Sequence, residues 1–372
     1  MERGYKYRIY PTPEQEVQIQ KTFGCVRFVF NHFLALRKNL YVTEKKSLSY
    51  KETSAILTQM KQKPETEWLA EVDATALQSS LRNLDTAFQN FFRGLKQGTF
   101  VGFPCFKSKK NRRRSYISKK VGENIKLLDG VVQLPKLGLV KCAVSRPIDG
   151  RILSATVSQT PSGKYYVSMC CTDVDIPQLA PAEKSVGLDV GIASFAVDSD
   201  GKKYQNHKYL RHSERKLIRA QRSLSRKSKG SKNRDKARIK VARIHEHIEA
   251  QRKDMLHKLT TKLIRENDVI CVEDLKVQNM MKNHKLAKSI ADASWFEFRR
   301  QLEYKAKWHG RKIIVVNPSN TSRCCSVCGT LSHEVKDLSV RSWTCSQCGS
   351  DHDRDGNAAK NILARGLQLL AL

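Results

Sequence analysis

The chain has 372 residues, with 68 Lys and Arg against 36 Asp and Glu, so its formal net charge at pH 7 is +32. This excess of cations excludes an ordinary metabolic enzyme as the first expectation and indicates a polyanionic partner, because like charges repel unless counter-charge is bound. Hydrophobic residues make up 40% of the chain, which excludes wholesale disorder.

The sequence has no apolar run of the roughly 18 residues that a membrane helix needs, and its first residues lack the apolar block of a secretory signal. The 11 cysteines are an odd number without an export signal, so we expect thiols or metal thiolates rather than disulfides. We therefore expect no membrane partner, a cytoplasmic location and nucleic acid as the polyanion.

The first half of the chain predicts a small β unit interrupted by helices. Residues 3–10 alternate cationic or small residues with aromatics and Ile, which is typical of a strand. Residues 14–97 predict helices, and a 4-3-4-3-4 spacing marks one core-facing stripe, formed by Leu77, Leu81, Leu84, Phe88, Phe91 and Leu95. Short strands follow over 125–171, with a hairpin turn at Asp129-Gly130. We expect the first strand to join them in an antiparallel barrel or sandwich.

A basic segment separates these helices from the later strands. Residues 107–120 carry eight Lys and Arg and no acid, among them Lys109, Lys110, Arg112, Arg113 and Arg114. A solvated loop would account for this composition, but a surface that contacts phosphates accounts for it better because so many like charges repel one another.

The second half predicts an α/β layer, since the strands expected at 186–190, 195–197, 269–273 and 313–316 alternate with helices. Residues 208–243 hold fifteen Lys and Arg against two acids and are interrupted at 227–232. A solvated helical hairpin is one interpretation. We favour a hairpin that binds nucleic acid, with Arg222, Arg226 and Lys227 among the contacting residues.

Two matching Cys-x-x-Cys-Gly segments lie at Cys325–Cys328 and Cys345–Cys348, with sixteen residues between them. This spacing is typical of a tetrahedral four-sulfur zinc site, and iron in the same cage is the alternative. Four thiolates leave zinc no open position, so we expect a structural role in a module of residues 318–350. Cys324 is expected to be a spare thiol.

Three acidic residues close or follow predicted elements: Asp189 and Glu273 at strand ends and Asp355 at the mouth of the last helix. Chemistry in open α/β sheets gathers outside the carboxyl ends of the strands. Three acids at one edge therefore predict a site for two Mg²⁺ ions about 4 Å apart, which clamp a phosphodiester. Each acid taken alone is equally typical of a turn or cap, as we expect for Asp274, Asp351 and Asp353.

Four ordered motifs resemble the TnpB family: Gly187–Gly191, Val272–Leu275, the paired cysteine knuckles and Asp353–Ile362. Phe28–Asn31 and Gly102–Phe106 are also similar, so the resemblance covers nearly the whole chain. This family comprises transposon-encoded RNA-guided DNA endonucleases, once called OrfB transposases and similar to type V CRISPR effectors.

The resemblance implies a multidomain α+β fold. A β-barrel wedge domain (residues 1–12 and 106–180) would hold an inserted helical recognition domain (13–105). An RNase H-like (RuvC) α/β nuclease domain (181–372) would follow, with a four-Cys zinc-ribbon insert at 318–350.

The resemblance also implies roles for single residues. Asp189, Glu273 and Asp355 map onto the catalytic acids that hold two Mg²⁺, and Cys325, Cys328, Cys345 and Cys348 onto the ligands of one structural Zn²⁺. Arg341 matches a family arginine near the active site and would steady a phosphate. Tyr50, Gln78 and Arg82 are candidates for reading a short motif in DNA.

The function implied is cleavage of double-stranded target DNA beside that motif, directed by a guide RNA from the transposon end. Base pairing would carry the long sequence specificity. We expect a monomer with its RNA in a prokaryotic cytoplasm, at the nucleoid when bound to DNA. The alternatives are a nuclease-inactive RNA-guided DNA-binding repressor, and a transposase or its accessory protein.

Overall fold

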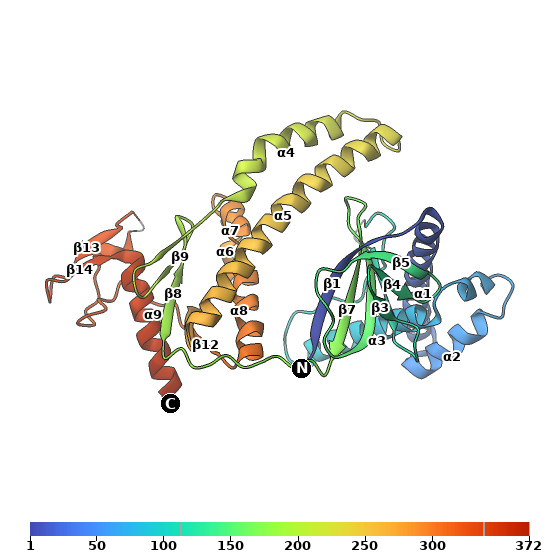
Figure 1. Ribbon diagram of the computed structural model, residues 1–372, viewed down its shortest axis with the longest axis horizontal. Helices are drawn as coiled ribbons and strands as arrows, with labels where there is room; N and C mark the ends of the chain where they lie inside the picture. The colour runs from blue at the N-terminus through green and yellow to red at the C-terminus, as the bar shows by residue number, and fades with distance from the viewer. Residues whose placement is uncertain (112–113, 338, 372) are drawn as a thin grey trace. The chain divides into compact units, whose positions relative to one another are not determined.

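The computed structural model describes residues 1–371 except Arg112, Arg113 and Leu338. The chain divides into two compact units, residues 1–175 and 176–372 (Figure 1), and each is described by itself. The nucleic-acid contacts predicted for Arg112 and Arg113 lie outside the described residues.

The first unit is built on a seven-stranded antiparallel sheet with the order β2-β6-β7-β1-β5-β4-β3. Its strands are β1 Arg3–Tyr10, β2 Arg114–Lys119, β3 Lys126–Leu128, β4 Val131–Leu134, β5 Gly138–Ala143, β6 Arg151–Gln159 and β7 Tyr165–Thr172. β1 pairs with β7 and β5, which confirms that the first strand joins the later ones. Its alternate residues Tyr5, Tyr7 and Ile9 are buried. Closure into a barrel stays a prediction.

The helices of this unit lie in the chain between β1 and β2: α1 Pro13–Glu44, α2 Tyr50–Met60, the 3-10 turn η1 Glu67–Glu71 and α3 Ala74–Lys96. Thr12 begins α1 with a capping box, because its hydroxyl accepts from Gln15 N while Gln15 Oε1 accepts from Thr12 N.

The core stripe predicted on α3 is correct only for its first half. Leu77, Leu81 and Leu84 are buried, whereas Leu95 is 63% exposed. The rings of Phe88 and Phe91 are part-exposed and pack on Phe103 of the following loop, with centroids 5.5 and 5.3 Å apart. Phe103 is itself exposed, so this loop cannot bury the end of the stripe.

The segment 107–120 is not a loop throughout, because residues 114–119 form β2. Its predicted contacts with phosphates stay a prediction. Tyr116 and Ser118 of this strand are buried. Arg114 donates from Nη1 to Gln20 Oε1 at 2.6 Å, so its guanidinium has a partner within the protein.

The second unit contains a five-stranded mixed sheet with the order β10-β9-β8-β11-β12. Its strands are β8 Ser185–Val190, β9 Ser194–Asp198, β10 Lys203–Gln205, β11 Val269–Glu273 and β12 Lys312–Val316. β8, β11 and β12 run parallel, and β9 and β10 are antiparallel to their neighbours. The predicted α/β layer is confirmed, although the sequence does not predict the three-residue β10.

Helices cover both faces of this sheet. Val186, Leu188 and Val272 pack into a core with α5 Lys232–Glu266 and α8 Trp295–His309. Because side chains alternate along a strand, the intervening residues lie on the opposite face, which α9 Arg354–Ala371 covers. α4 Tyr209–Ser225 forms the predicted basic hairpin with α5 (Figure 1), and α6 Val277–Met280 and α7 Ala287–Ala293 are short.

The cysteine-containing segment follows β12. It comprises the 3-10 turn η2 Glu334–Lys336 and a two-stranded antiparallel sheet of β13 Ser342–Thr344 and β14 Asp351–Asp353. In the described part of the chain, no helix is long and apolar enough to cross a bilayer.

The second unit begins at Ile176, a few residues before the boundary at 181 that the family resemblance implies. Residues 177–180 belong with it because they bond to α8 and the turn after it. Gln178 donates to the Trp308 carbonyl at 3.3 Å, and Arg311 donates to the Ala180 carbonyl at 2.6 Å.

Candidate functional site

Two glycines allow α9 to lie directly on the sheet. A Cβ added to Gly187 of β8 would lie 2.1 Å from the Ala359 carbonyl oxygen, and one added to Gly366 of α9 would lie 2.2 Å from Cys271 Sγ. Because real side chains never approach so closely, glycine is required at both positions for this helix-to-sheet distance.

This contact places two of the predicted acids at similar distances from it, one along α9 and the other along β8. Asp355 lies one helical turn before Ala359, about 6 Å along the axis, and Asp189 lies two residues after Gly187, about 6.6 Å along the strand. Glu273 comes from the neighbouring parallel strand, where Val272 is paired with Leu188. The topology therefore puts the three predicted acids at the carboxyl edge of the sheet, on the face that α9 covers, although their carboxylates are not gathered as compactly as the four thiols described below.

The electrostatics of Asp189 agree with this placement. Burial raises its pKa well above the ordinary value, and the neighbouring carboxylates of Glu273 and Asp355 raise it further. The guanidinium groups of Arg341 and Arg354 act in the opposite direction. Burial also raises the pKa of Glu273. Such a site favours a bound cation, since like charges held close together cannot all ionise without one.

Two of the three carboxylates are held by hydrogen bonds. The Thr321 hydroxyl donates to Glu273 Oε1 at 2.6 Å, and Arg341 Nη2 donates to Asp355 Oδ2 at 2.7 Å. Each bond uses one carboxylate oxygen and leaves the other as a possible metal ligand. The sequence predicts Arg341 near the acids but gives no indication of Thr321.

The neighbouring acids have structural partners, as the sequence predicts. Asp353 Oδ1 accepts from the Gly356 N–H at 2.9 Å at the start of α9, and its Oδ2 accepts from Lys203 at 2.9 Å. Asp274 accepts from Arg299 Nη1 at 2.6 Å. Both oxygens of Asp353 are therefore occupied, which separates it from Asp355 as a candidate metal ligand.

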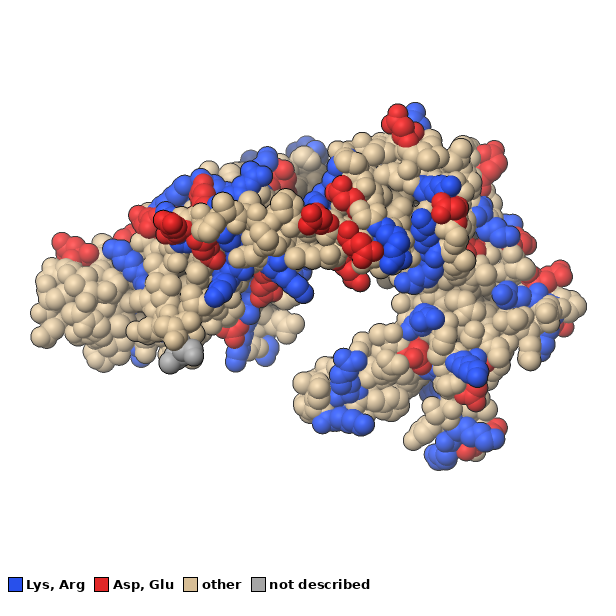
Figure 2. All heavy atoms as spheres, turned by 60° about the horizontal axis from the view of Figure 1, so that its bottom comes forward, with Lys and Arg blue, Asp and Glu red and all other residues tan. Residues whose placement is uncertain are grey.

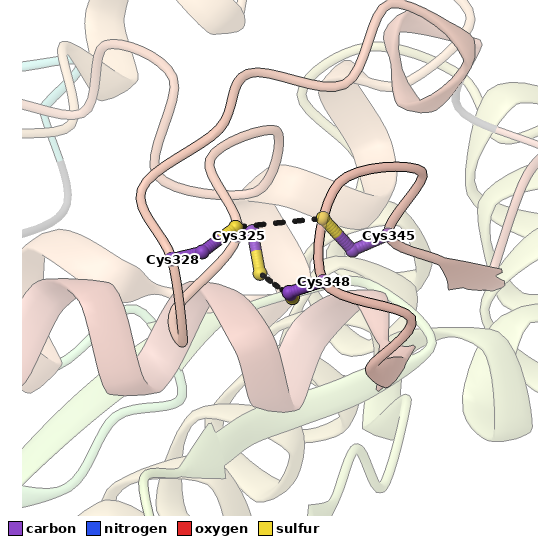
Figure 3. Close-up of side chains that lie close together, drawn as sticks. All are labelled: Cys325, Cys328, Cys345 and Cys348. Carbon is purple, nitrogen blue, oxygen red and sulfur yellow. Dashed lines mark hydrogen bonds between the residues drawn. The ribbon is translucent and has the colours of Figure 1, made fainter.

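The four predicted thiols lie together. The Sγ atoms of Cys325, Cys328, Cys345 and Cys348 all lie within 4.8 Å of one another and point inward from two loops (Figure 3). Cys325 and Cys348 are 3.7 Å apart, and Cys328 and Cys345 are 3.6 Å apart. A tetrahedral zinc with bonds of 2.3 Å requires sulfurs about 3.8 Å apart. These two separations match that value and the others stay within 4.8 Å, so the cluster has the size of a four-sulfur zinc site. Among the described residues, no other group of His, Cys, Asp or Glu is this compact.

The two knuckles share one backbone geometry. Gly329 N donates to the Cys325 carbonyl at 2.9 Å, and Gly349 N donates to the Cys345 carbonyl at 2.8 Å. Both glycines have positive φ, +80° and +71°, which glycine adopts at little cost. Cys324 lies outside the cluster, with its Sγ 3.2 Å from the Gly329 carbonyl oxygen.

Three residues predicted to read DNA form one group on α2 and α3. Tyr50 Oη donates to Gln78 Oε1 at 2.8 Å, and the Arg82 guanidinium lies 4.8 Å from the centre of the Tyr50 ring. Gln78 Oε1 also accepts from Ser54 at 3.1 Å. The structure thus brings Tyr50 of α2 together with Gln78 and Arg82 of α3.

The remaining basic candidates are exposed. Lys109 and Lys110 lie in the turn before β2. At the end of α4, a groove of about 700 Å³ is lined by five cations, namely Arg215, Arg219, Arg222, Arg226 and Lys227. The lining of this groove contains no acid. Over the face drawn in Figure 2, by contrast, Lys and Arg are interspersed with Asp and Glu.

Comparison with known families gives three matches along the chain. Residues 168–284 match the family OrfB_IS605, described as "Probable transposase", and residues 295–362 match "Cas12f1-like, TNB domain". Residues 1–46 match a "Helix-turn-helix domain", although here they form β1 and the single helix α1.

Solved structures with the same fold include a Cas12f1–sgRNA–target DNA complex, with a TM-score of 0.52, 15% identity and coverage of 97% of this chain and 98% of that one. The mini-RNA-guided endonuclease CRISPR-Cas_phi3 has a TM-score of 0.54, 10% identity and coverage of 98% and 92%. By fold, the chain belongs to this class of multidomain α/β proteins.

Proteins that are similar in sequence identify the family to which the chain belongs. A Streptomyces pristinaespiralis protein named "Putative RNA-guided DNA endonuclease" is 43% identical, covering 99% of this chain and 90% of the relative. InsQ of Escherichia coli K12, which has the same description, is 35% identical, with coverage of 99% and 93%. The chain belongs to the TnpB family, as its motifs predict.

Proposed function

We propose that this protein is an RNA-guided DNA endonuclease that hydrolyses phosphodiester bonds at Asp189, Glu273 and Asp355. The observation that carries the proposal is the placement of three carboxylates, from β8, β11 and α9, at one edge of a sheet, where two of them act on the pKa of the third, in a chain of net charge +32. The names of the two full-length relatives support the same activity.

The donor set suits Mg²⁺, which prefers carboxylate oxygens and retains several waters. Two such ions, when bound, would generate the attacking hydroxide and stabilise the leaving oxygen of the phosphodiester. Asp189 is the acid on which the carboxylates of both Glu273 and Asp355 act, so it would be a ligand common to the site when metal is bound. Arg341 is exposed beside Asp355, where its guanidinium can bind a phosphate of the substrate.

The four thiolates are proposed to hold one Zn²⁺ in a structural role. All four tetrahedral positions are then filled by protein, so no position remains for substrate. The segment around them has a single buried cluster of Cys325, Val335, Trp343 and Cys345, which is too small to specify a fold without the metal.

The polyanionic partners are proposed to be a guide RNA from the transposon end and double-stranded target DNA. The domain roles follow the family: residues 13–105 for recognition, 1–12 and 106–180 as a barrel-like wedge, and 181–372 as an RNase H-like nuclease. The Tyr50–Gln78–Arg82 group would read the short motif beside the target, since its amide and guanidinium are suited to base edges.

The test is cleavage of matched DNA by the protein loaded with its co-purified RNA. Glu273→Gln should abolish cleavage while RNA binding persists, whereas Asp274→Asn, at the adjacent carboxylate, should cleave normally. Cleavage by Glu273→Gln would contradict the assignment of the acids. Absence of product from the wild type in every divalent ion would favour the DNA-binding repressor, and joining of transposon ends would favour a transposase.

A further inference from the structure

The segment 317–326 links β12 to the first cysteine knuckle and passes directly over the acidic site. It contains no helix or strand, so its position depends on bonds to its surroundings. Most of these come from one face of α9, where Asn357, Asn361 and Arg365 are spaced four residues apart. Side chains at this spacing lie in one row along a helix.

The row makes a ladder of hydrogen bonds to the main chain of the segment. Asn361 Nδ2 donates to the Thr321 and Cys324 carbonyls at 2.8 and 2.6 Å. Asn357 Nδ2 donates to the Cys324 carbonyl at 2.7 Å, and its Oδ1 accepts from Ser326 N at 2.9 Å.

Arg365 extends the ladder by one turn, donating to the Ser319 carbonyl at 2.6 Å. Asn357 and Asn361 are buried. Their amides therefore bond to this segment instead of water, and loss of either one would leave buried carbonyls unpaired.

At the centre of the held segment, Thr321 is 4% exposed and turns its hydroxyl to Glu273 Oε1 at 2.6 Å. We infer that Thr321 is a positioning residue for Glu273, and that α9 shapes the acidic site in two ways: it carries Asp355, and through the ladder it holds Thr321. This inference rests on the proposed function, because it assigns Glu273 a metal to bind.

The physical reason lies in the freedom of a glutamate side chain. Without a partner, the carboxylate of Glu273 can rotate about its last bond. A hydrogen bond to Oε1 fixes the plane and directs Oε2 to one place. Second-sphere bonds of this kind typically contribute about 10- to 100-fold to metal affinity or activity.

The first test compares Thr321→Val, which keeps the shape and removes the hydroxyl, with Thr321→Ser, which keeps the hydroxyl. Cleavage is measured against Mg²⁺ concentration, and Mn²⁺ binding to the protein is followed by electron paramagnetic resonance. We expect Thr321→Val to raise the half-saturating concentration of both ions about 10- to 100-fold, and Thr321→Ser to restore it to within a few-fold.

Zinc content and RNA binding should be unchanged in all of these variants. Thr43→Val, at an exposed position near the end of α1, is the matched control and should behave as wild type. Wild-type metal dependence in Thr321→Val would overturn the inference, and so would failure of Thr321→Ser to restore it.

The second test examines the ladder by a measurement that does not depend on DNA cleavage. Asn361→Ala loses its bonds to the Thr321 and Cys324 carbonyls, and the milder Arg365→Ala loses its bond to the Ser319 carbonyl. Each variant should accelerate amide hydrogen exchange over residues 317–326 by at least about tenfold, because main-chain carbonyls of the segment lose their partners. Asn90→Ala on α3 is the control. Unchanged exchange in both variants would overturn the ladder. If the wild type neither cleaves DNA nor binds Mn²⁺, the proposed function fails, while the exchange result still decides the ladder.

Discussion

Gly187→Ala tests whether the contact between α9 and β8 sets the acidic site. The new Cβ would lie 2.1 Å from the Ala359 carbonyl oxygen and 2.6 Å from Leu363 N. Ordinary C···O contacts begin at about 3.3 Å, so α9 would have to move by about 1.2 Å. Overpacking of this kind costs about 1–3 kcal/mol.

The functional effect should exceed the loss of stability. Asp355 lies one turn from the point of contact, so it moves with the helix, and a misplacement of about 1 Å can reduce a rate about 100-fold. We therefore expect Gly187→Ala to fold, with a melting temperature lower by about 2–10 °C, and to cleave matched DNA about 100-fold more slowly.

The assay is single-turnover cleavage by RNA-loaded protein, with melting measured on the same preparations. Gly4→Ala is the matched control, because a Cβ on this strand glycine meets nothing within 4 Å, and it should retain both rate and stability. Cleavage by Gly187→Ala at the wild-type rate would refute the argument that this contact positions Asp355.

Three further outcomes are expected. Cys345→Ser should lower the zinc content, measured by metal analysis, and destabilise the second unit, because zinc coordination supplies much of the folding free energy of such a small module; full zinc retention would contradict the four-thiolate site. At neutral pH and without added Mg²⁺, Asp189→Asn should raise the free energy of unfolding by about 1–2 kcal/mol. The melting temperature should rise with it. The pKa of Asp189 is raised in the folded state, so wild-type stability falls as pH rises above the ordinary value of 3.8. The advantage of Asp189→Asn should accordingly shrink on acidification, and an advantage that grows at low pH would be inconsistent with it. Arg222→Ala with Arg226→Ala should weaken RNA or DNA binding and reduce the slope of log K against log salt by about one per residue; an unchanged slope would remove the α4 groove from the nucleic-acid surface.

The sequence predicts well those features that depend on neighbouring residues. Periodicity locates most strands of the two sheets, though not β2 or β10, and the break between α4 and α5. The repeat of Cys-x-x-Cys-Gly selects Cys325 over Cys324. Each of these features depends on residues that are close together along the chain, so the sequence alone can reveal it.

Prediction fails where packing between distant segments decides the outcome. The stripe on α3 continues to Leu95 in sequence, yet nothing large enough covers its end. Arg114 belongs to a basic run, yet it lies in a strand and bonds to Gln20. The ladder on α9 has a visible spacing of four residues, but Asn and Arg at that spacing are equally typical of a solvated face.

By itself, the sequence determined most of the elements and the four thiols and, through a family resemblance, proposed the three acids. The tertiary structure decided that Asp189, Glu273 and Asp355 share one edge and that Thr321 holds one of them. The physical reason is that alternation along a strand assigns a side chain to a face, but only the close approach of α9 at Gly187 determines what lies across from it.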